Sequence, residues 1–176
     1  MKDQEKVVLD TNILVSVLHS PAGTVGKCFE HVIKNQEMVF TEETSKEFLN
    51  VLNQKKFNKI FTPEIKEKFK ESLYGLSKFV EPKLFLDICR DQKDNKFISL
   101  AEQEKAKYLV TGDEDLLAID RKLVKTNIVT PRQFLEQERV IAQQPAIPVT
   151  MPKAVSYTHL DVYKRQAEKM PSYCFL

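Results

Sequence analysis

The chain has 176 residues, of which 42% are hydrophobic and 30% charged, so it fits one compact globular domain plus some tail and is not a disordered protein. Its formal net charge is only +2, so any nucleic-acid binding has to come from a local basic surface or a metal ion. No apolar run approaches the roughly 20 residues of a membrane helix, and charges interrupt the amino-terminal stretch MKDQEKVVLD, so we expect a cytoplasmic protein with no membrane partner.

Short apolar runs alternate with amphipathic stretches along most of the chain. Runs rich in β-branched or aromatic residues that end in polar residues predict four strands, at residues 6–10, 37–41, 107–113 and 126–131. A fifth strand is expected near residues 80–85. Helical spacing predicts helices at residues 22–35, 42–54, 63–79 and 95–106. This alternation indicates an α/β fold with a mainly parallel sheet covered on both faces.

The character of the sequence changes at about Gln143. Prolines 145, 148, 152 and 171 follow with no sustained hydrophobic period. We therefore expect one domain over residues 1–142 and a disordered tail outside the core over residues 143–176. The tail segment VSYTHLDVYKRQ resembles translated adaptor sequence rather than native chain, and we assign no function to its residues.

Acidic residues fall where predicted strands end or predicted helices begin. Asp10 ends the first strand, and Asp113 follows the strand that contains YLVT. Glu47 lies early in the helix after the second strand, four residues before Val51, and Asp94 stands where the next helix begins. Ligands of a parallel sheet collect at the carboxyl ends of its strands, so the fold can bring these four acids to one rim.

Each acid alone also has an ordinary structural interpretation. Asp94 and Asp113 suit helix caps, and Glu47 suits a solvated helix position. Four acids at corresponding strand ends are harder to explain as independent caps. Two carboxylates about 4 Å apart repel by about 4 kcal/mol at an effective dielectric constant near 20, so such a cluster needs protons or cations. Hard oxygen ligands favour Mg²⁺ or Mn²⁺.

Four segments in a fixed order carry a family resemblance: VVLDTN, ETSKEFLNVL, DQKDNKFISLA and YLVTGDEDLL. Together they resemble the PIN-domain family of metal-dependent ribonucleases, and most of all its branch of toxins from toxin–antitoxin pairs. The resemblance covers residues 5–138 and implies a three-layer α/β/α fold with a central parallel sheet of four or five strands. It also implies a catalytic Mg²⁺ or Mn²⁺ site made by Asp10, Glu47, Asp94 and Asp113. Four further residues match positions that support such a site: Thr11, Asn12, Thr111 and Asp115.

The resemblance implies an endoribonuclease that hydrolyses RNA phosphodiester bonds, with RNA as substrate and an antitoxin protein and a second copy of the chain as partners. Two alternatives stay open. A haloacid-dehalogenase-like phosphatase would use Asp10 as nucleophile, although such sites carry a second Asp two residues later, where this chain has Asn12. A non-catalytic, partner-binding PIN-like module would instead offer a helical groove within residues 48–76.

Overall fold

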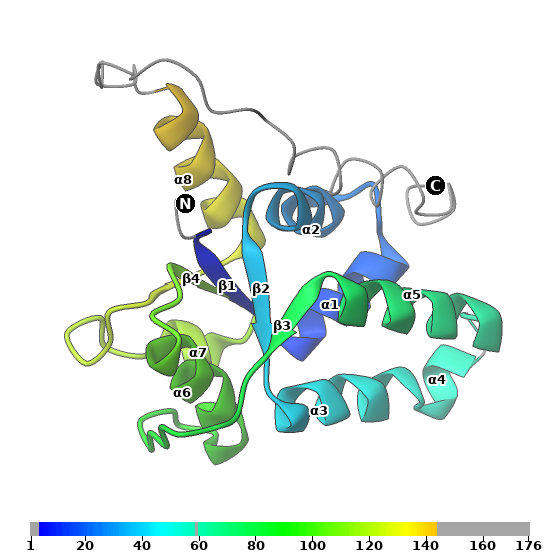
Figure 1. The fold of residues 1–176 in the computed structure, drawn as a ribbon, viewed down its shortest axis with the longest axis horizontal. Coiled ribbons are helices and arrows are strands. Elements are labelled where there is room, and N and C mark those ends of the chain that lie inside the picture. Colours follow the sequence, from blue (N-terminus) through cyan, green and yellow to red (C-terminus); the bar gives the residue numbers. More distant parts are fainter. Residues whose placement is uncertain (1–3, 59, 144–176) are drawn as a thin grey trace, which may run out of the picture.

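A computed structural model describes residues 4–58 and 60–143. Within these residues, five parallel strands form one sheet in the order β3-β2-β1-β4-β5 (Figure 1). The strands are β1 (Lys6–Leu9), β2 (Glu37–Phe40), β3 (Ser77–Phe79), β4 (Tyr108–Val110) and β5 (Asn127–Val129). The chain builds outward from β1 to β3, then crosses over and builds outward again from β4, so the strand order reverses between β1 and β4. Open parallel sheets bind ligands outside the carboxyl ends of the strands at such a reversal.

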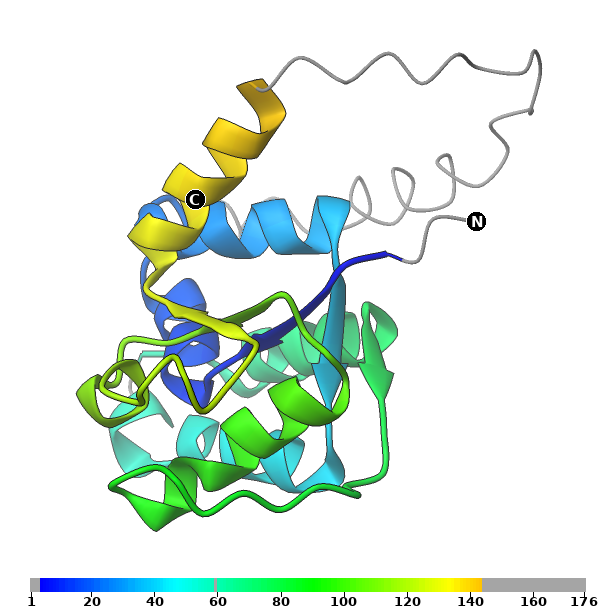
Figure 2. The ribbon, with the colours of Figure 1, turned by 90° about the vertical axis from the view of Figure 1, so that its left-hand side faces the viewer.

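Helices cover both faces of the sheet, which confirms the predicted three-layer α/β/α architecture (Figures 1 and 2). They are α1 (Thr11–His19), α2 (Thr24–Asn35), α3 (Glu42–Leu52), α4 (Lys55–Asn58), α5 (Pro63–Gly75), α6 (Asn95–Gln103), α7 (Glu114–Leu117) and α8 (Pro131–Gln143), with a 3-10 turn at Gln92–Asp94. Val7 and Leu9 of β1 pack on the face covered by α1, α2, α3, α5 and α8. Val8 points to the opposite face, against α6 and α7, as expected for successive residues of a strand.

Several predicted boundaries differ from the observed ones. The helix predicted over residues 63–79 ends at Gly75, and the fifth strand is Ser77–Phe79 rather than residues 80–85. The sequence analysis also missed the helices at both ends of the domain, α1 and α8. In α1 the apolar, β-branched run after Asp10 resembles a continuing strand, but a helix begins there because the Asp10 side chain accepts a hydrogen bond from the Asn12 N–H.

The predicted tail at residues 143–176 lies outside the described part of the chain, apart from Gln143 at the end of α8. The proposed domain end at residue 142 therefore stays a prediction. Among the helices that the structure describes, none is long and apolar enough to cross a membrane.

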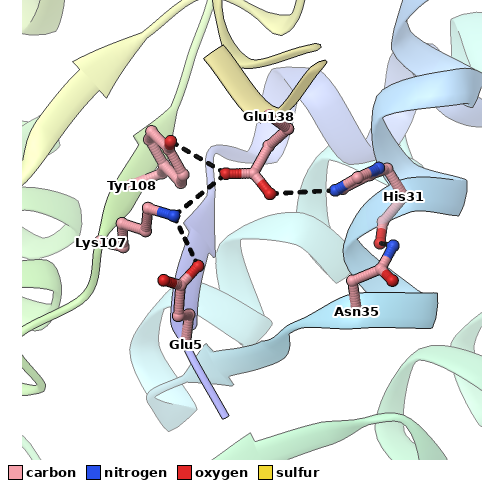
Figure 3. A network of polar contacts seen from close by, with 6 residues as sticks. All are labelled: Glu5, His31, Asn35, Lys107, Tyr108 and Glu138. Carbon is pink, nitrogen blue, oxygen red and sulfur yellow. Dashed lines mark hydrogen bonds and ion pairs between the residues drawn. The ribbon is translucent and has the colours of Figure 1, made fainter. Parts of the chain in front are cut away.

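A polar network joins α8 to the amino-terminal end of the sheet (Figure 3). The Glu138 carboxylate accepts hydrogen bonds from the Tyr108 hydroxyl at 3.0 Å and Lys107 Nζ at 3.2 Å, and it pairs with His31 Nε2 at 3.1 Å. Lys107 Nζ also contacts Glu5 at 2.7 Å. Burial would raise the pKa of Glu138, but its three hydrogen-bond partners lower it overall. The network thus ties α2, β4 and α8 together at the end of the sheet opposite to Asp10.

We expect Glu138→Ala to lower the free energy of unfolding by about 2 kcal/mol. Removing one partner from a buried ionic network typically costs about 3–5 kcal/mol, and the partial exposure of Lys107 and His31 reduces this cost. Urea unfolding of the full chain measures the change. The matched control is Glu136→Ala on the exposed side of α8, which should stay within about 0.5 kcal/mol of the wild type. Equal effects of the two variants would show that the network does not anchor α8.

Candidate active site

Asp10 and Thr111 meet at the point where the strand order reverses. Asp10 follows β1 and is buried, and its Oδ2 accepts a hydrogen bond from Thr111 Oγ1 at 2.8 Å. Its Oδ1 accepts from the backbone N–H of Asn12 at 3.3 Å, while the Asn12 side chain is exposed. Thr111 follows β4 and also accepts a hydrogen bond from the backbone N–H of Asp113 at 2.9 Å. One fully buried hydroxyl therefore orients Asp10 and the loop that carries Asp113.

Asp113 caps α7, as the structural interpretation of the sequence allowed. Its Oδ1 accepts a hydrogen bond from the backbone N–H of Asp115 at 2.8 Å. This leaves Asp113 Oδ2 without a hydrogen-bond partner among the described residues. The Asp115 side chain forms an ion pair with Arg90, which links α7 to the segment before the 3-10 turn. Asp115 thus supports the loop around Asp113 through its backbone and its side chain.

Asp94 precedes α6, but its side chain makes no capping hydrogen bond. Partial burial, followed by the charges of Asp113 and Asp10, raises the pKa of Asp94 to about 6, with smaller contributions from Asp91 and Glu47. Burial also raises the pKa of Asp10, against its two hydrogen bonds, and Glu47 and Asp113 add to the rise. The charges of Glu47 and Asp113 therefore act on both Asp10 and Asp94 at the carboxyl ends of the strands.

Glu47 reaches the site from α3 and forms an ion pair with Lys96 of α6. Both side chains are largely buried, so this pair is not an ordinary solvated surface contact. The Lys96 ammonium places a positive charge at the edge of the acidic site. The sequence analysis missed Lys96. The only available signal was its position two residues after Asp94, at the start of the predicted helix.

Carboxylate oxygens are the donors that Mg²⁺ and Mn²⁺ prefer, so the site suits a divalent cation by its chemistry. In the described part of the chain, however, no three Asp, Glu, His or Cys side chains come close enough to hold one ion together. The Thr11 hydroxyl, next in sequence to Asp10, is buried and has no hydrogen-bond partner in that part of the chain. The raised pKa values of Asp10 and Asp94 and the unpartnered Thr11 hydroxyl are features that a hydrated cation would stabilise.

We expect Asp94→Asn to stabilise the metal-free protein near neutral pH. The pKa of Asp94 is about 6 in the folded chain and 3.8 ordinarily, so the folded state binds the proton more tightly than the unfolded state does. The charged carboxylate therefore opposes folding at neutral pH, and this penalty disappears as the pH falls through 6 toward about 4. Thermal melts in chelator measure the difference from the wild type. A difference that is independent of pH, or an Asn variant that is less stable at neutral pH, would contradict this assignment.

The parallel α/β sheet with acids at its strand reversal belongs to the α/β class of domains that bind ligands at the carboxyl ends of their strands, and a comparison with known families identifies which family it is. The PIN domain profile matches residues 6–115, a range that contains all four acids. The chain belongs to the PIN domain family. Members of this family are generally nucleases, and they typically use divalent metal ions. The family and the fold predicted from the sequence are thereby confirmed.

Two individual proteins are also similar to the chain. The uncharacterized protein MJ1680 of Methanocaldococcus jannaschii is 29% identical over 148 residues, an alignment that covers 75% of this chain and 90% of that protein. The crystal structure of VapBC2 from Rickettsia felis bound to a DNA fragment from their promoter matches with a TM-score of 0.47 and 16% identity. That match covers 70% of this chain and 96% of the compared chain.

Proposed function

We propose that the protein is an endoribonuclease that hydrolyses RNA phosphodiester bonds with the help of Mg²⁺ or Mn²⁺. The observation that carries this proposal is that the charges of Glu47 and Asp113 raise the pKa values of both Asp10 and Asp94 at the strand reversal. Membership of the PIN domain family supports it, because nuclease activity is general in that family. RNA as the substrate rests on the sequence resemblance.

Each acid has a distinct part in the proposed site. Asp10 and Asp113 serve as oriented ligands, because the Thr111 hydroxyl fixes the Asp10 side chain and the loop of Asp113. Asp94 makes no capping hydrogen bond and is free to turn toward a cation. Glu47 joins the site by releasing Lys96. A bound divalent ion supplies polarisation of the phosphoryl oxygen and a lowered pKa of a coordinated water.

The toxin role is a further part of the proposal, and it rests on the resemblance of the four sequence segments to that branch. The toxin role implies a cytoplasmic protein with an antitoxin as partner. We also propose that the chain forms a homodimer. A small gene directly upstream whose product copurifies with this chain would support the toxin role. Light scattering of the purified chain tests the dimer, since a monomer at high concentration contradicts it.

The residue two positions after Asp10 weighs against the phosphatase alternative. There, where such phosphatases carry an acid, Asn12 has an amide that cannot transfer a proton. A covalent phosphate on Asp10 after incubation with a phosphomonoester would revive this alternative.

The test of the proposal is RNA cleavage by the purified full chain. Single-stranded and structured RNAs are incubated with Mg²⁺, with Mn²⁺ and with excess chelator. We expect defined fragments that require the metal and that an identically purified Asp10→Asn variant does not produce. Cleavage that persists in excess chelator, or no cleavage with either metal, would contradict the proposal. Full activity of the Asp10→Asn preparation would contradict the assignment of Asp10 to the active site.

A further inference from the structure

The segment between β3 and the 3-10 turn, residues 80–91, runs without regular secondary structure along α6, and we call it the strap (Figure 1). Three polar side chains, spaced four residues apart on one face of α6, accept hydrogen bonds from the backbone of the strap. The pairs are the Leu84 N–H with Gln103 at 3.2 Å, the Leu86 N–H with Ser99 at 2.8 Å and the Ile88 N–H with Asn95 at 3.0 Å. These side chains take the place of a neighbouring strand and hold the strap in a defined path.

A pocket of about 290 Å³ lies between the strap, the start of α3 and α6. Its lining includes Gln92, Lys93, Asn95 and Lys96, the residues on either side of Asp94. The Lys96 ammonium also pairs with Glu47, so the pocket directly borders the acidic site. A ligand in the pocket would therefore lie next to any phosphodiester bound at the four acids.

The strap presents an aromatic ring at this pocket. Phe85 lines it and is 78% exposed, more than any other large apolar side chain in the described residues. Exposed aromatic rings beside cationic groups are typical of sites where single-stranded nucleic acid stacks its bases. Polar residues that can bond to a base edge are also present, since Glu43 and Gln92 line the pocket.

We propose that this pocket binds one unpaired nucleobase of single-stranded RNA, stacked on Phe85, and thereby positions the adjoining phosphodiester at the acidic site. The inference rests on the proposed ribonuclease function. Lys93 supplies positive charge for the RNA backbone, as does Lys96 once Glu47 binds a cation. A base in a duplex is stacked on both of its faces and paired along one edge, so only an unpaired base can enter the pocket.

The edge of the strap that faces α6 is closed to a peptide. A peptide that binds by strand addition needs a row of free backbone N–H and C=O groups. On this edge the N–H groups of Leu84, Leu86 and Ile88 are already taken by the α6 side chains. The pocket volume of about 290 Å³ is near the lower limit for ligand pockets, which suits a single base.

The test compares Phe85 variants of the full chain for binding to a short fluorescein-labelled single-stranded RNA by fluorescence anisotropy in chelator. We expect Phe85→Ala to weaken binding on the order of 10-fold, because base stacking on an aromatic side chain is lost. Phe85→Trp should keep wild-type affinity, whereas Phe85→Leu should resemble Phe85→Ala since it retains apolar volume without a ring. In cleavage assays with Mg²⁺, Phe85→Ala should raise KM by a similar factor.

Control measurements distinguish a loss of base stacking from a loss of folding. They also distinguish failure of this inference from failure of the ribonuclease proposal. Val140→Ala on α8, where Val140 is 58% exposed, should bind RNA like the wild type, and all variants should melt at the wild-type temperature. Unchanged affinity of Phe85→Ala, equal affinity of the Leu and Trp variants, or no RNA binding by the wild type would overturn the inference. Phe85-dependent binding without metal-dependent cleavage would leave the inference standing and refute the ribonuclease proposal.

Discussion

Asp10→Asn is expected to lower metal-dependent RNA cleavage by at least about 100-fold and to melt at or above the wild-type temperature without metal. Loss of a group that merely supports a metal ligand typically costs about 10- to 100-fold, and loss of a ligand should cost more. The asparagine keeps the size of Asp10 and can still accept the hydrogen bond from the Asn12 N–H. It also removes one buried negative charge from a site where the acids repel one another. Initial cleavage rates and calorimetric melting in chelator measure the two effects.

The control for Asp10→Asn is Glu42→Gln. The Glu42 side chain is 80% exposed and pairs only with Lys46 on the same helix, so its removal should leave cleavage unchanged. Asp10 also caps α1, and a purely structural role would have the opposite effects on the cleavage rate and on the melting temperature. If the cap were its whole function, Asp10→Asn would cut RNA at the wild-type rate and melt at a slightly lower temperature.

Thr111→Val should weaken Mn²⁺ binding by about 10- to 100-fold, the usual effect of losing a group that orients a metal ligand. Valine preserves the branched shape in this fully buried position but removes the hydroxyl. Asp10 Oδ2 then loses its donor, and the Asp113 N–H loses its acceptor. We also expect the free energy of unfolding to fall by about 1–3 kcal/mol, because buried polar groups are left unpaired. Calorimetric titration with Mn²⁺ and urea unfolding measure the two changes.

Thr111→Ser is the matched control, since it retains the hydroxyl and loses only a methyl group. It should bind Mn²⁺ within a few-fold of the wild type. Wild-type affinity in Thr111→Val would show that Asp10 and Asp113 need no common support. Equal losses in the Ser and Val variants would attribute the effect to packing around the methyl group.

The central strands could be predicted because strands buried on both faces form short continuous apolar runs, as in VVL and YLV. The placement of Asp10 and Asp113 followed from topology, because parallel strands end at the same edge of a sheet. Asp94 and Glu47 were harder to place, since each position also suits an ordinary helix residue. The family resemblance, rather than periodicity, selected them.

Contacts between distant segments could not be predicted from the sequence. His31 and Glu138 are 107 residues apart, and nothing in either local pattern indicates that they meet. The pairing of Glu47 with Lys96 likewise depends on how α3 and α6 pack. The path of the strap could not be predicted for the same reason, because its backbone forms hydrogen bonds with side chains of α6 instead of with a neighbouring strand. Patterns with a period of 2 or 3.6 residues report the face of an element, not its partner.

The most direct test of the proposed metal site is the position of Mn²⁺ in crystals of the full chain, located by its anomalous scattering. We predict a peak within about 2.5 Å of carboxylate oxygens of Asp10, Asp94 and Asp113. Glu47 should turn toward the ion and Lys96 away from it. No peak at saturating Mn²⁺, or a peak bound only by other residues, would contradict the proposal that these four acids form one metal site.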